Sequence, residues 1–244
     1  MTWIEHEKQV IEWANKTPGH LTGIDCPLCL NRGYFTRLTD DGYRKSEECS
    51  CMAKRRSLAR IKKSGLSDLM DRYTFDRWQT KQEWQRKVKE MALDYAENNS
   101  GWFYMAGRPG TGKTHICTAL CGALIEKGME VQYLLWRDFS SRAKAVVTDD
   151  EEYQRLVEPI KRVKVLYIDD LFKTGKGQEP TTGDTNLAFE ILNARYIQGK
   201  PTIISSELTV QMILDIDEAI GSRIFERSKE HYADLSDREN FRLS

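Results

Sequence analysis

The sequence predicts an α/β protein in which a nucleotide-binding domain, built on a parallel sheet, follows a small cysteine-bearing module. Three observations carry this prediction. From about residue 99 onward, apolar strands alternate with helical segments, a glycine-rich loop typical of phosphate binding occupies residues 107–114, and four of the six cysteines fall between residues 26 and 51. Alternation of this kind is typical of a parallel sheet covered by helices on both faces.

The composition is that of a globular protein of 244 residues. Its 37 basic side chains balance 37 acidic ones, so any contact with DNA must come from a local basic patch rather than from overall charge. No apolar run approaches the roughly 18 residues that cross a bilayer, and residues 1–7 are unlike a signal peptide. The clustered cysteines are unlike a secreted disulfide scaffold. We therefore expect a cytoplasmic protein without a membrane partner.

The first 98 residues are predicted to form a module and a linker. A helix over residues 1–17 begins with the capping-box spacing of Thr2 and Glu5. A run of six cations in ten residues, 54–63, is either a solvated linker helix or a second DNA-facing strip. The other predicted elements are a hairpin, the basic connector and a second helix, at residues 34–39 with 43–49, 52–73 and 81–98. The expected domains are residues 1–60, 61–98 and 99–244.

A phosphate-binding loop is the strongest signal in the chain. The pattern G-x-x-x-x-G-K-[ST] occurs once, between a predicted strand at 102–106 and a predicted helix at 113–127. Its glycines let backbone N–H groups approach phosphate oxygens, and the helix dipole favours the anion. We expect Lys113 to reach the β- and γ-phosphates of ATP and Thr114 to hold Mg²⁺. The residues predicted to bind nucleotide here are Gly107, Pro109, Gly110, Thr111, Gly112, Lys113, Thr114 and His115.

An apolar strand predicted at residues 163–168 ends in two carboxylates. We expect Asp169 to be a Mg²⁺ ligand through water and Asp170 to polarise the attacking water, a role more often filled by Glu. A further strand at 201–206 fits the class of ATPases that have an extra strand between the phosphate loop and the acidic strand. The remaining predicted strand covers residues 131–136.

Four cysteines follow the spacing C-x₂-C-x₁₉-C-x-C, which is close to the four-thiolate zinc pattern. A segment of about 30 residues cannot bury enough core to fold alone, so bound Zn²⁺ would supply folding energy. Such a site is closed, and its expected role is structure and docking rather than catalysis. Incidental buried thiols and an iron–sulfur cluster are the alternatives. The predicted zinc ligands are Cys26, Cys29, Cys49 and Cys51.

The remaining cysteines and the isolated histidines are expected to have structural positions rather than roles in a site. Cys117 and Cys121 are spaced i, i+4 on a predicted helix and are expected to pack in the interior. The isolated histidines are interpreted as surface or capping residues, and His20 is the one near enough to the cysteines to be a substitute ligand.

Three further motifs give the chain a family resemblance. Residues 193–196 (Asn-Ala-Arg-Tyr), 202–206 and 221–223 follow the phosphate loop and acidic strand in order. With the cysteine module, they resemble the DnaC/DnaI replicative helicase loaders, AAA+ ATPases related to the IstB transposition helper, and above all the DnaC-like loaders of phages and Gram-positive bacteria. The resemblance implies an AAA+ fold with a parallel five-stranded sheet and no separate helical lid.

The resemblance also implies roles for single residues. Arg223 resembles the arginine finger that is donated to the ATP of a neighbouring subunit, with a helix-surface arginine as the alternative. Arg242 resembles the second sensor. Where the family usually has the first-sensor Asn, Glu207 follows Ser205-Ser206, and a carboxylate cannot donate a hydrogen bond as an amide can. Either Ser206 takes over this role, or turnover is slow.

DNA contacts are expected from two segments. In the family, the segment after the second strand carries a helix that lines a central channel, here residues 137–144. Phe139, Arg142 and Lys144 would stack a base and hold phosphates, unless the helix is solvated with Phe139 in the core. Lys173 opens a flexible loop that is either a second contact with single-stranded DNA or simply mobile.

The function implied is that of a weak ATPase that grips a DnaB-like hexameric helicase through its N-terminal module. ATP and single-stranded DNA would control its assembly into a ring or spiral, and the cofactors would be ATP, Mg²⁺ and Zn²⁺. Two alternatives stay open: an IstB-like transposition helper that acts on duplex DNA with a transposase, and a zinc-dependent adaptor that binds ATP with little hydrolysis.

Overall fold

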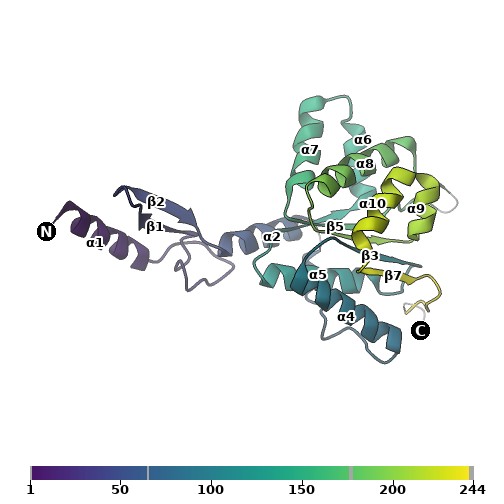
Figure 1. The fold of residues 1–244 in the computed structure, drawn as a ribbon, viewed down its shortest axis with the longest axis horizontal. Helices are drawn as coiled ribbons and strands as arrows, with labels where there is room; N and C mark the ends of the chain where they lie inside the picture. Colours follow the sequence, from purple (N-terminus) through teal and green to yellow (C-terminus); the bar gives the residue numbers. More distant parts are fainter. Residues whose placement is uncertain (1, 65, 176–177, 242–244) are drawn as a thin grey trace. The chain divides into compact units, whose positions relative to one another are not determined.

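The computed structural model describes residues 2–64, 66–175 and 178–241, and the chain divides into two compact units, residues 1–59 and 60–244 (Figure 1). The boundary falls one residue before the predicted end of the N-terminal module, and the predicted division into residues 1–60, 61–98 and 99–244 stays a prediction. The helix α2 (Cys51–Ser64) crosses the boundary, so the basic run at 54–63 is helical, as one of its two interpretations expected.

The N-terminal unit contains the predicted helix and hairpin. Helix α1 (Trp3–Lys16) begins with the predicted capping box of Thr2 and Glu5. Strands β1 (Tyr34–Leu38) and β2 (Arg44–Glu48) pair antiparallel. The Asn15 side chain joins helix to hairpin, since its Nδ2 donates to the Thr36 carbonyl at 2.7 Å and its Oδ1 accepts from the Thr36 N–H at 3.0 Å. The hairpin is thereby held against the last turn of α1.

A five-stranded parallel sheet forms the centre of the second unit, as the resemblance implied. Its order is β4-β5-β6-β3-β7, and each neighbouring pair is parallel. β5 extends three residues beyond its predicted end. β7, at one edge of the sheet, was not predicted. The strands are β3 (Trp102–Gly107), β4 (Val131–Leu135), β5 (Val165–Leu171), β6 (Thr202–Ser206) and β7 (Tyr232–Leu235).

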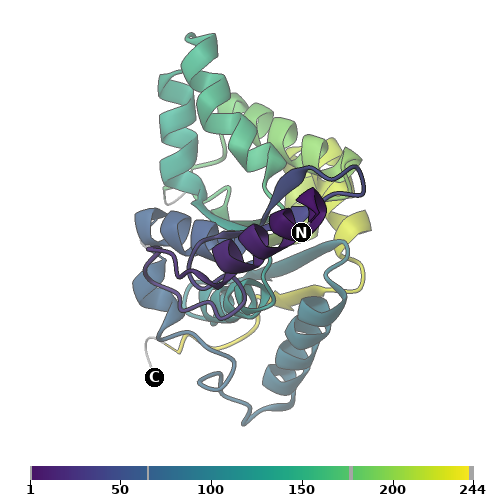
Figure 2. The ribbon, with the colours of Figure 1, turned by 90° about the vertical axis from the view of Figure 1, so that its left-hand side faces the viewer.

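Helices cover both faces of this sheet. Figures 1 and 2 show α4 and α5 on one face and α6 to α10 on the other. Every residue of β3 is buried, because alternate side chains enter the two layers. The helices of this unit after α2 are α3 (Ser67–Met70), α4 (Glu83–Asn98), α5 (Lys113–Glu126), α6 (Trp136–Ala145), α7 (Asp150–Arg162), α8 (Thr182–Ile197), α9 (Val210–Ile216) and α10 (Glu218–Ser228). Among the described residues, no helix is both long and apolar enough to span a membrane.

A fully buried arginine ties several of these elements together. Arg195, on α8, donates to backbone carbonyls of Ile160 (3.0 Å), Val163 (3.0 Å) and Pro201 (2.6 Å), and its Nε donates to the Thr202 hydroxyl at 2.9 Å. These carbonyls belong to the end of α7 and to the residues that lead into β5 and β6. Arg195 therefore satisfies buried acceptors at three chain segments and sets where both strands begin.

Candidate functional site

The loop between β3 and α5 has the geometry of a phosphate cradle. Gly107, Gly110 and Gly112 have φ of 148°, 81° and 94°, a region that favours glycine. Lys113 is buried and folds back over the loop, where its Nζ donates to the Gly107 carbonyl at 2.6 Å and to the Arg108 carbonyl at 3.1 Å. Burial lowers the pKa of Lys113, while Asp170 and Asp169 oppose that shift. The ammonium is thus poised above the loop for an anion.

A cavity of about 470 Å³ opens beside this loop, at the carboxyl ends of the strands. In open α/β sheets, ligands bind at this edge. The cavity is lined by two lysines, Lys113 and Lys173, and by two carboxylates, those of Asp170 and Glu207. Its lining residues are Tyr73, Pro109, Gly110, Gly112, Lys113, Thr114, His115, Asp170, Lys173, Glu207 and Phe241.

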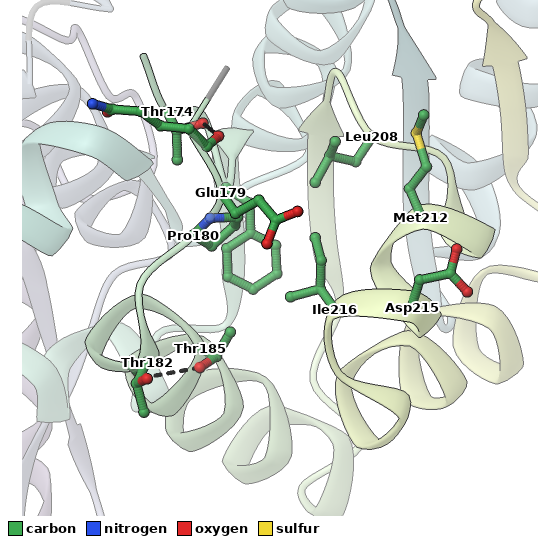
Figure 3. Close-up of a pocket in the computed structure, with 11 residues that line it drawn as sticks. Thr174, Glu179, Pro180, Thr182, Thr185, Leu208, Met212, Asp215 and Ile216 are labelled. Carbon is green, nitrogen blue, oxygen red and sulfur yellow. Dashed lines mark hydrogen bonds between the residues drawn. The ribbon is translucent and has the colours of Figure 1, made fainter. Parts of the chain in front are cut away.

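A second hollow, of about 530 Å³, lies between the 172–185 segment and α9 (Figure 3). Figure 3 shows the carboxylates of Glu179 and Asp215 on its two sides. Among its described lining residues none is a lysine, arginine or histidine. It therefore lacks the positive charge that a triphosphate requires, and the cavity beside Lys113 is the nucleotide candidate.

Asp169 is held rigidly at the end of β5. Its Oδ1 accepts from the hydroxyls of Tyr167 (2.7 Å) and Ser205, and its Oδ2 accepts from Tyr133 at 3.1 Å. The Thr114 hydroxyl lies 3.5 Å from Oδ1. A hydroxyl and a carboxylate this close are the hard oxygen donors that Mg²⁺ prefers, so the residues fit the predicted ion. The supporting Tyr133 and Ser205 were not predicted, because neither belongs to a recognisable motif.

Asp170 differs from its neighbour in conformation and surroundings. It lies in the left-handed region with φ of 55°, and its N–H donates to Ser205 Oγ at 3.1 Å. This backbone conformation interrupts the alternation of β5 and places Asp170 among the residues that line the cavity. The structure thus separates the two acids, one fixed beside Thr114 and one lining the cavity, and their predicted roles stay predictions.

Ser206 does not reach the cavity, contrary to its predicted role as a substitute sensor. It is fully buried, its hydroxyl donates to the Leu171 carbonyl at 2.8 Å, and its Oγ accepts from the Leu208 N–H at 3.1 Å. Glu207, the next residue, lines the cavity instead. Ser206 therefore orders the turn after β6, while the side chain that lines the cavity at this position is the carboxylate of Glu207.

Lys173 lies elsewhere than predicted. The sequence placed it on a DNA-facing loop, yet it lines the nucleotide cavity and forms an ion pair with Glu207. Its position is fixed by the turn before it, in which the Lys173 N–H donates to the Asp170 carbonyl at 2.9 Å and Phe172 is buried in the core. Residues 176–177 of the same predicted loop lie outside the described residues.

Aromatic side chains close one side of the cavity. The His115 ring stacks on Tyr73 at 4.8 Å and meets Trp78 edge-on at 5.3 Å, and its Nε2 lies 3.0 Å from the Thr74 carbonyl. Burial lowers the pKa of His115. This histidine is therefore a half-buried wall residue of the nucleotide cavity and not a surface or capping residue. Residues 73–78 were missed because they carry no periodic pattern.

The chain end also approaches the phosphate loop. The Phe241 N–H donates to the Gly110 carbonyl at 3.0 Å, and the Phe241 ring stacks on Trp84 at 6.0 Å. A Cβ atom at Gly110 would collide with the Asn240 side chain, so this packing requires glycine there. Arg242, the predicted second sensor, lies outside the described residues.

Arg223 is held by a dedicated set of contacts on α8 and α10. Its Nε donates to Asn193 Oδ1 at 3.0 Å and its Nη1 to the Ala219 carbonyl at 2.7 Å. Its guanidinium lies 5.1 Å from the Phe189 ring centroid and 5.3 Å from that of Tyr196. Arg223 is not among the described residues that line the cavity of its own chain, and its predicted role toward a neighbouring subunit stays a prediction.

The predicted DNA contacts on α6 are only partly exposed. Phe139 is 6% exposed and packs in the main core, so it cannot stack a base. Lys144 pairs with Asp184 at 2.8 Å. Arg142 is exposed. The core alternative for Phe139 is thus the correct one. The cations of this helix are Arg137, Arg142 and Lys144, of which Lys144 is already paired with Asp184.

The four predicted zinc ligands meet in the N-terminal unit. Their sulfur atoms all lie within 4.8 Å of one another, with Cys26–Cys49 at 3.8 Å and Cys29–Cys51 at 3.7 Å. Zinc–sulfur bonds of about 2.3 Å in a tetrahedron imply sulfurs about 3.8 Å apart, so the quartet fits Zn²⁺. His20 is exposed and outside this group.

The other two cysteines have no part in this quartet. Cys117 and Cys121 are buried on α5, which confirms their predicted packing in the interior.

Sequence comparisons place the chain among known ATP-binding proteins. The profile of the family described as IstB-like ATP binding protein matches residues 44–238. The chain is 31% identical to YqaM of Bacillus subtilis (strain 168) over 197 residues, 76% of this chain and 62% of YqaM. It is 30% identical to the phage-like element PBSX protein XkdC of the same organism, over 85% of this chain and 80% of XkdC. The replicative helicase loader DnaC of Escherichia coli (strain K12) is 24% identical over 68% of this chain and 67% of DnaC.

Solved structures share the fold of the second unit. The crystal structure of the DnaC helicase loader superposes with a TM-score of 0.57 at 21% identity, over 68% of this chain and 97% of that one. AMPPCP-bound DnaA from Aquifex aeolicus gives 0.57 at 22% identity, over 70% and 52% of the two chains. DnaI gives 0.53 at 17% identity, over 70% and 92%. These similarities show an AAA+ fold.

Proposed function

Because this chain belongs to the family of IstB-like ATP binding proteins, we propose that it is an AAA+ ATPase that delivers a replicative hexameric helicase onto single-stranded DNA. The observation that carries the proposal is the position of Lys113, Thr114 and Asp170 at one cavity, with Asp169 directly beside Thr114, in a chain that also bears a four-thiolate unit. The similarity to DnaC of Escherichia coli, a replicative helicase loader by name, supports the choice of process.

Binding of ATP would begin with an exchange of partners at Lys113. Its ammonium leaves the Gly107 and Arg108 carbonyls, now 2.6 and 3.1 Å away, and takes phosphate oxygens. The N–H groups at the start of α5 then face the phosphates along the helix dipole. Tyr73 and His115, on the aromatic side of the cavity, are placed to receive the base.

The acids would divide the hydrolytic work. Mg²⁺, held by the Thr114 hydroxyl and by Asp169, would neutralise charge on the β- and γ-phosphates. Asp169 can do so without rearrangement, because Tyr133 and Tyr167 already fix its carboxylate. Asp170 would orient the attacking water. Its side chain is one methylene shorter than that of Glu, so its carboxylate would lie farther from that water, and we expect the ATPase activity to be weak.

Hydrolysis would also require a second subunit. Arg223 is held by Asn193 and by two aromatic rings and does not line its own cavity. Donated across a subunit interface, its guanidinium would neutralise the charge that spreads over the γ-phosphate oxygens in the transition state. Assembly into a ring or spiral with ATP would thus switch hydrolysis on.

The N-terminal unit would supply the helicase contact. Zn²⁺ bound to its four thiolates would hold the unit together, since its core is small. Trp3, Trp13 and Tyr43 are exposed by 60%, 72% and 72%. Large exposed aromatic side chains are the usual anchors of protein interfaces, so this surface is the proposed docking site for the helicase.

The experiment that tests the proposal is co-purification with the full-length chain. With ATP and Mg²⁺ present, the tagged chain should retain the hexameric replicative helicase of its host, and Trp3→Ser with Trp13→Ser should reduce this retention. Leu93→Ser is a matched control, because Leu93 is an exposed apolar residue of the other unit. Retention of a transposase in place of the helicase would instead establish the transposition-helper alternative, to which the family profile also points.

A further inference from the structure

Two serines at the end of β6, Ser205 and Ser206, hydrogen-bond to the backbone at the end of β5. Ser205 Oγ accepts from the Asp170 N–H at 3.1 Å, and Ser206 Oγ donates to the Leu171 carbonyl at 2.8 Å. These bonds fix the backbone just before Lys173 and just before Glu207. The ion pair between Lys173 and Glu207 is therefore placed by the strands themselves and not by a free loop.

The pair occupies the side of the cavity where a γ-phosphate would lie. Lys173 and Glu207 line the cavity together with Lys113, in the turns that follow β5 and β6. In a phosphate-loop site the terminal phosphate points toward the strand that carries the acidic residues, which here is β5. Lys173 follows Asp170 by three residues in the same turn, and its side chain is 32% exposed. Its ammonium thus lies at the end of β5, the strand toward which a third phosphate would point.

One carboxylate of the cavity, that of Glu207, would lie near a bound γ-phosphate without a role in binding it. Lys113, Lys173, Asp170 and Glu207 line the cavity, and the charges of Asp170 and Asp169 act on Lys113. Asp169 and Asp170 have the roles already argued, in metal binding and water orientation. Glu207 has neither, and an unshielded carboxylate beside a polyanion would oppose its binding. Lys173 supplies the shielding.

We propose that Lys173 binds the γ-phosphate of ATP, and that Glu207 holds its ammonium in place while weakening that contact, so that the pair sets the preference for ATP over ADP. An ammonium has three donors, so Lys173 can bind Glu207 and a phosphate oxygen together. This inference rests on the nucleotide site of the proposed function. It assigns to Lys173 the γ-phosphate contact that a first-sensor amide makes elsewhere.

The alternative is an ion pair that only stabilises the two turns. The two cases differ in what they predict for ADP. Loss of a turn-stabilising pair would disturb ATP and ADP binding alike, because both nucleotides use the same phosphate loop. Loss of a γ-phosphate ligand would weaken ATP binding alone. The ratio of the two affinities therefore separates the cases.

The test is equilibrium titration of the full-length chain with Mg²⁺ and either ADP or the β,γ-methylene analogue of ATP. Lys173→Met should weaken binding of the ATP analogue by about tenfold or more, the usual effect of one charged hydrogen bond, and change ADP binding less than about threefold. Lys173→Arg should restore part of the preference. Glu207→Gln keeps an acceptor for Lys173 but removes the negative charge, so it should strengthen analogue binding several-fold.

Controls separate this inference from the proposed function. Lys164→Met makes the same change of charge at the amino end of β5, where Lys164 is exposed, and should leave both affinities unchanged. Equal losses for both nucleotides in Lys173→Met, or unchanged or weaker analogue binding in Glu207→Gln, would overturn the assignment. Failure of the unaltered chain to bind either nucleotide would instead overturn the proposed function.

Discussion

At the scale of single residues, the site depends on side chains that hold other side chains. Asp169 lies beside Thr114 because hydroxyl groups of Tyr133 and Tyr167 fix both of its oxygens. The Arg223 side chain is held in place because its Nε donates a hydrogen bond to Asn193 Oδ1. Pre-ordered groups of this kind lose little conformational entropy when a nucleotide binds. More of the free energy of their contacts is therefore available to stabilise the transition state.

The proposed role of Arg223 as an arginine finger gives the first prediction. Arg223→Ala should reduce ATP turnover by about a hundredfold or more, because no guanidinium would reach the neighbouring γ-phosphate, while nucleotide affinity stays within a few-fold. Arg227→Ala is the matched control, since Arg227 also lies over the Tyr196 ring, at 5.1 Å. Steady-state ATPase assays and nucleotide titrations measure both quantities. Turnover that falls equally in the two variants would contradict the assignment.

Residue patterns explain which parts of the site were predictable. Lys113, Thr114, Asp169 and Asp170 form contiguous motifs whose chemistry is local, and the structure brings them together as expected. Lys173 was misplaced because its position depends on the burial of Phe172 against Trp136, a contact between distant segments. Such long-range packing has no signature in the local sequence.

At the scale of helices and strands, α6 and α8 are joined through one carboxylate. Asp184, in the first turn of α8, accepts from the Thr181 hydroxyl at 2.6 Å, from Lys144 at 2.8 Å and from Ser140. Burial raises the pKa of Asp184, but these hydrogen bonds outweigh it and lower the pKa to about 2. The charged form is therefore the one that holds the helices together.

This junction predicts an acid-dependent loss of stability. Because the pKa of Asp184 is lower in the folded chain than its usual 3.8, its contribution is complete above that value and lost as pH falls toward 2. Asp184→Asn should cost about 2 kcal/mol at pH 7 and less at pH 3. Urea unfolding at the two pH values measures the difference. A cost that is the same at both would refute the role of the charge.

The buried Arg195 gives a second prediction at this scale. Arg195→Met would leave the Ile160, Val163 and Pro201 carbonyls without their donor, which should cost about 3 kcal/mol or more in the free energy of unfolding. Arg162→Met is the control, because Arg162 is exposed and only pairs with Glu158, and should cost under about 1 kcal/mol. Equal costs in denaturant unfolding would show that the buried network is not the cause.

Most elements could be predicted, and the exceptions have physical reasons. The strands around the phosphate loop are apolar runs with clear boundaries. β7 (Tyr232–Leu235) is short, carries Asp234 and exposes Tyr232 by 38%, so it lacks the pattern of a buried strand and is recognised only through its pairing with β3. Phe139 could not be assigned between core and surface, because a single aromatic on an amphipathic helix suits both.

At the scale of the whole molecule, the chain consists of two units with different sources of stability. Residues 60–244 enclose a large apolar core around the sheet. The compact cluster of residues 1–59 that contains the cysteines is small, with Phe35 packed against three buried thiols. A bound metal is the expected source of its stability.

This contrast predicts a selective effect of metal removal. The purified chain should contain about one zinc per molecule, and Cys49→Ser should abolish zinc binding and unfold the N-terminal unit while nucleotide affinity persists. Cys121→Ala, which removes a thiol buried on α5, should keep its zinc. Elemental analysis with far-ultraviolet circular dichroism measures both. Less than half a zinc per chain, with four freely alkylated thiols, would contradict the metal assignment.

The most direct test of the account is a titration of the full-length chain with the β,γ-methylene analogue of ATP in the presence of Mg²⁺. The arrangement of Lys113 over the loop and of Thr114 beside Asp169 predicts one bound nucleotide per chain. Lys113→Ala should weaken that binding at least tenfold. Absence of binding to the unaltered chain, or equal binding by Lys113→Ala, would contradict the claim that this loop holds a triphosphate.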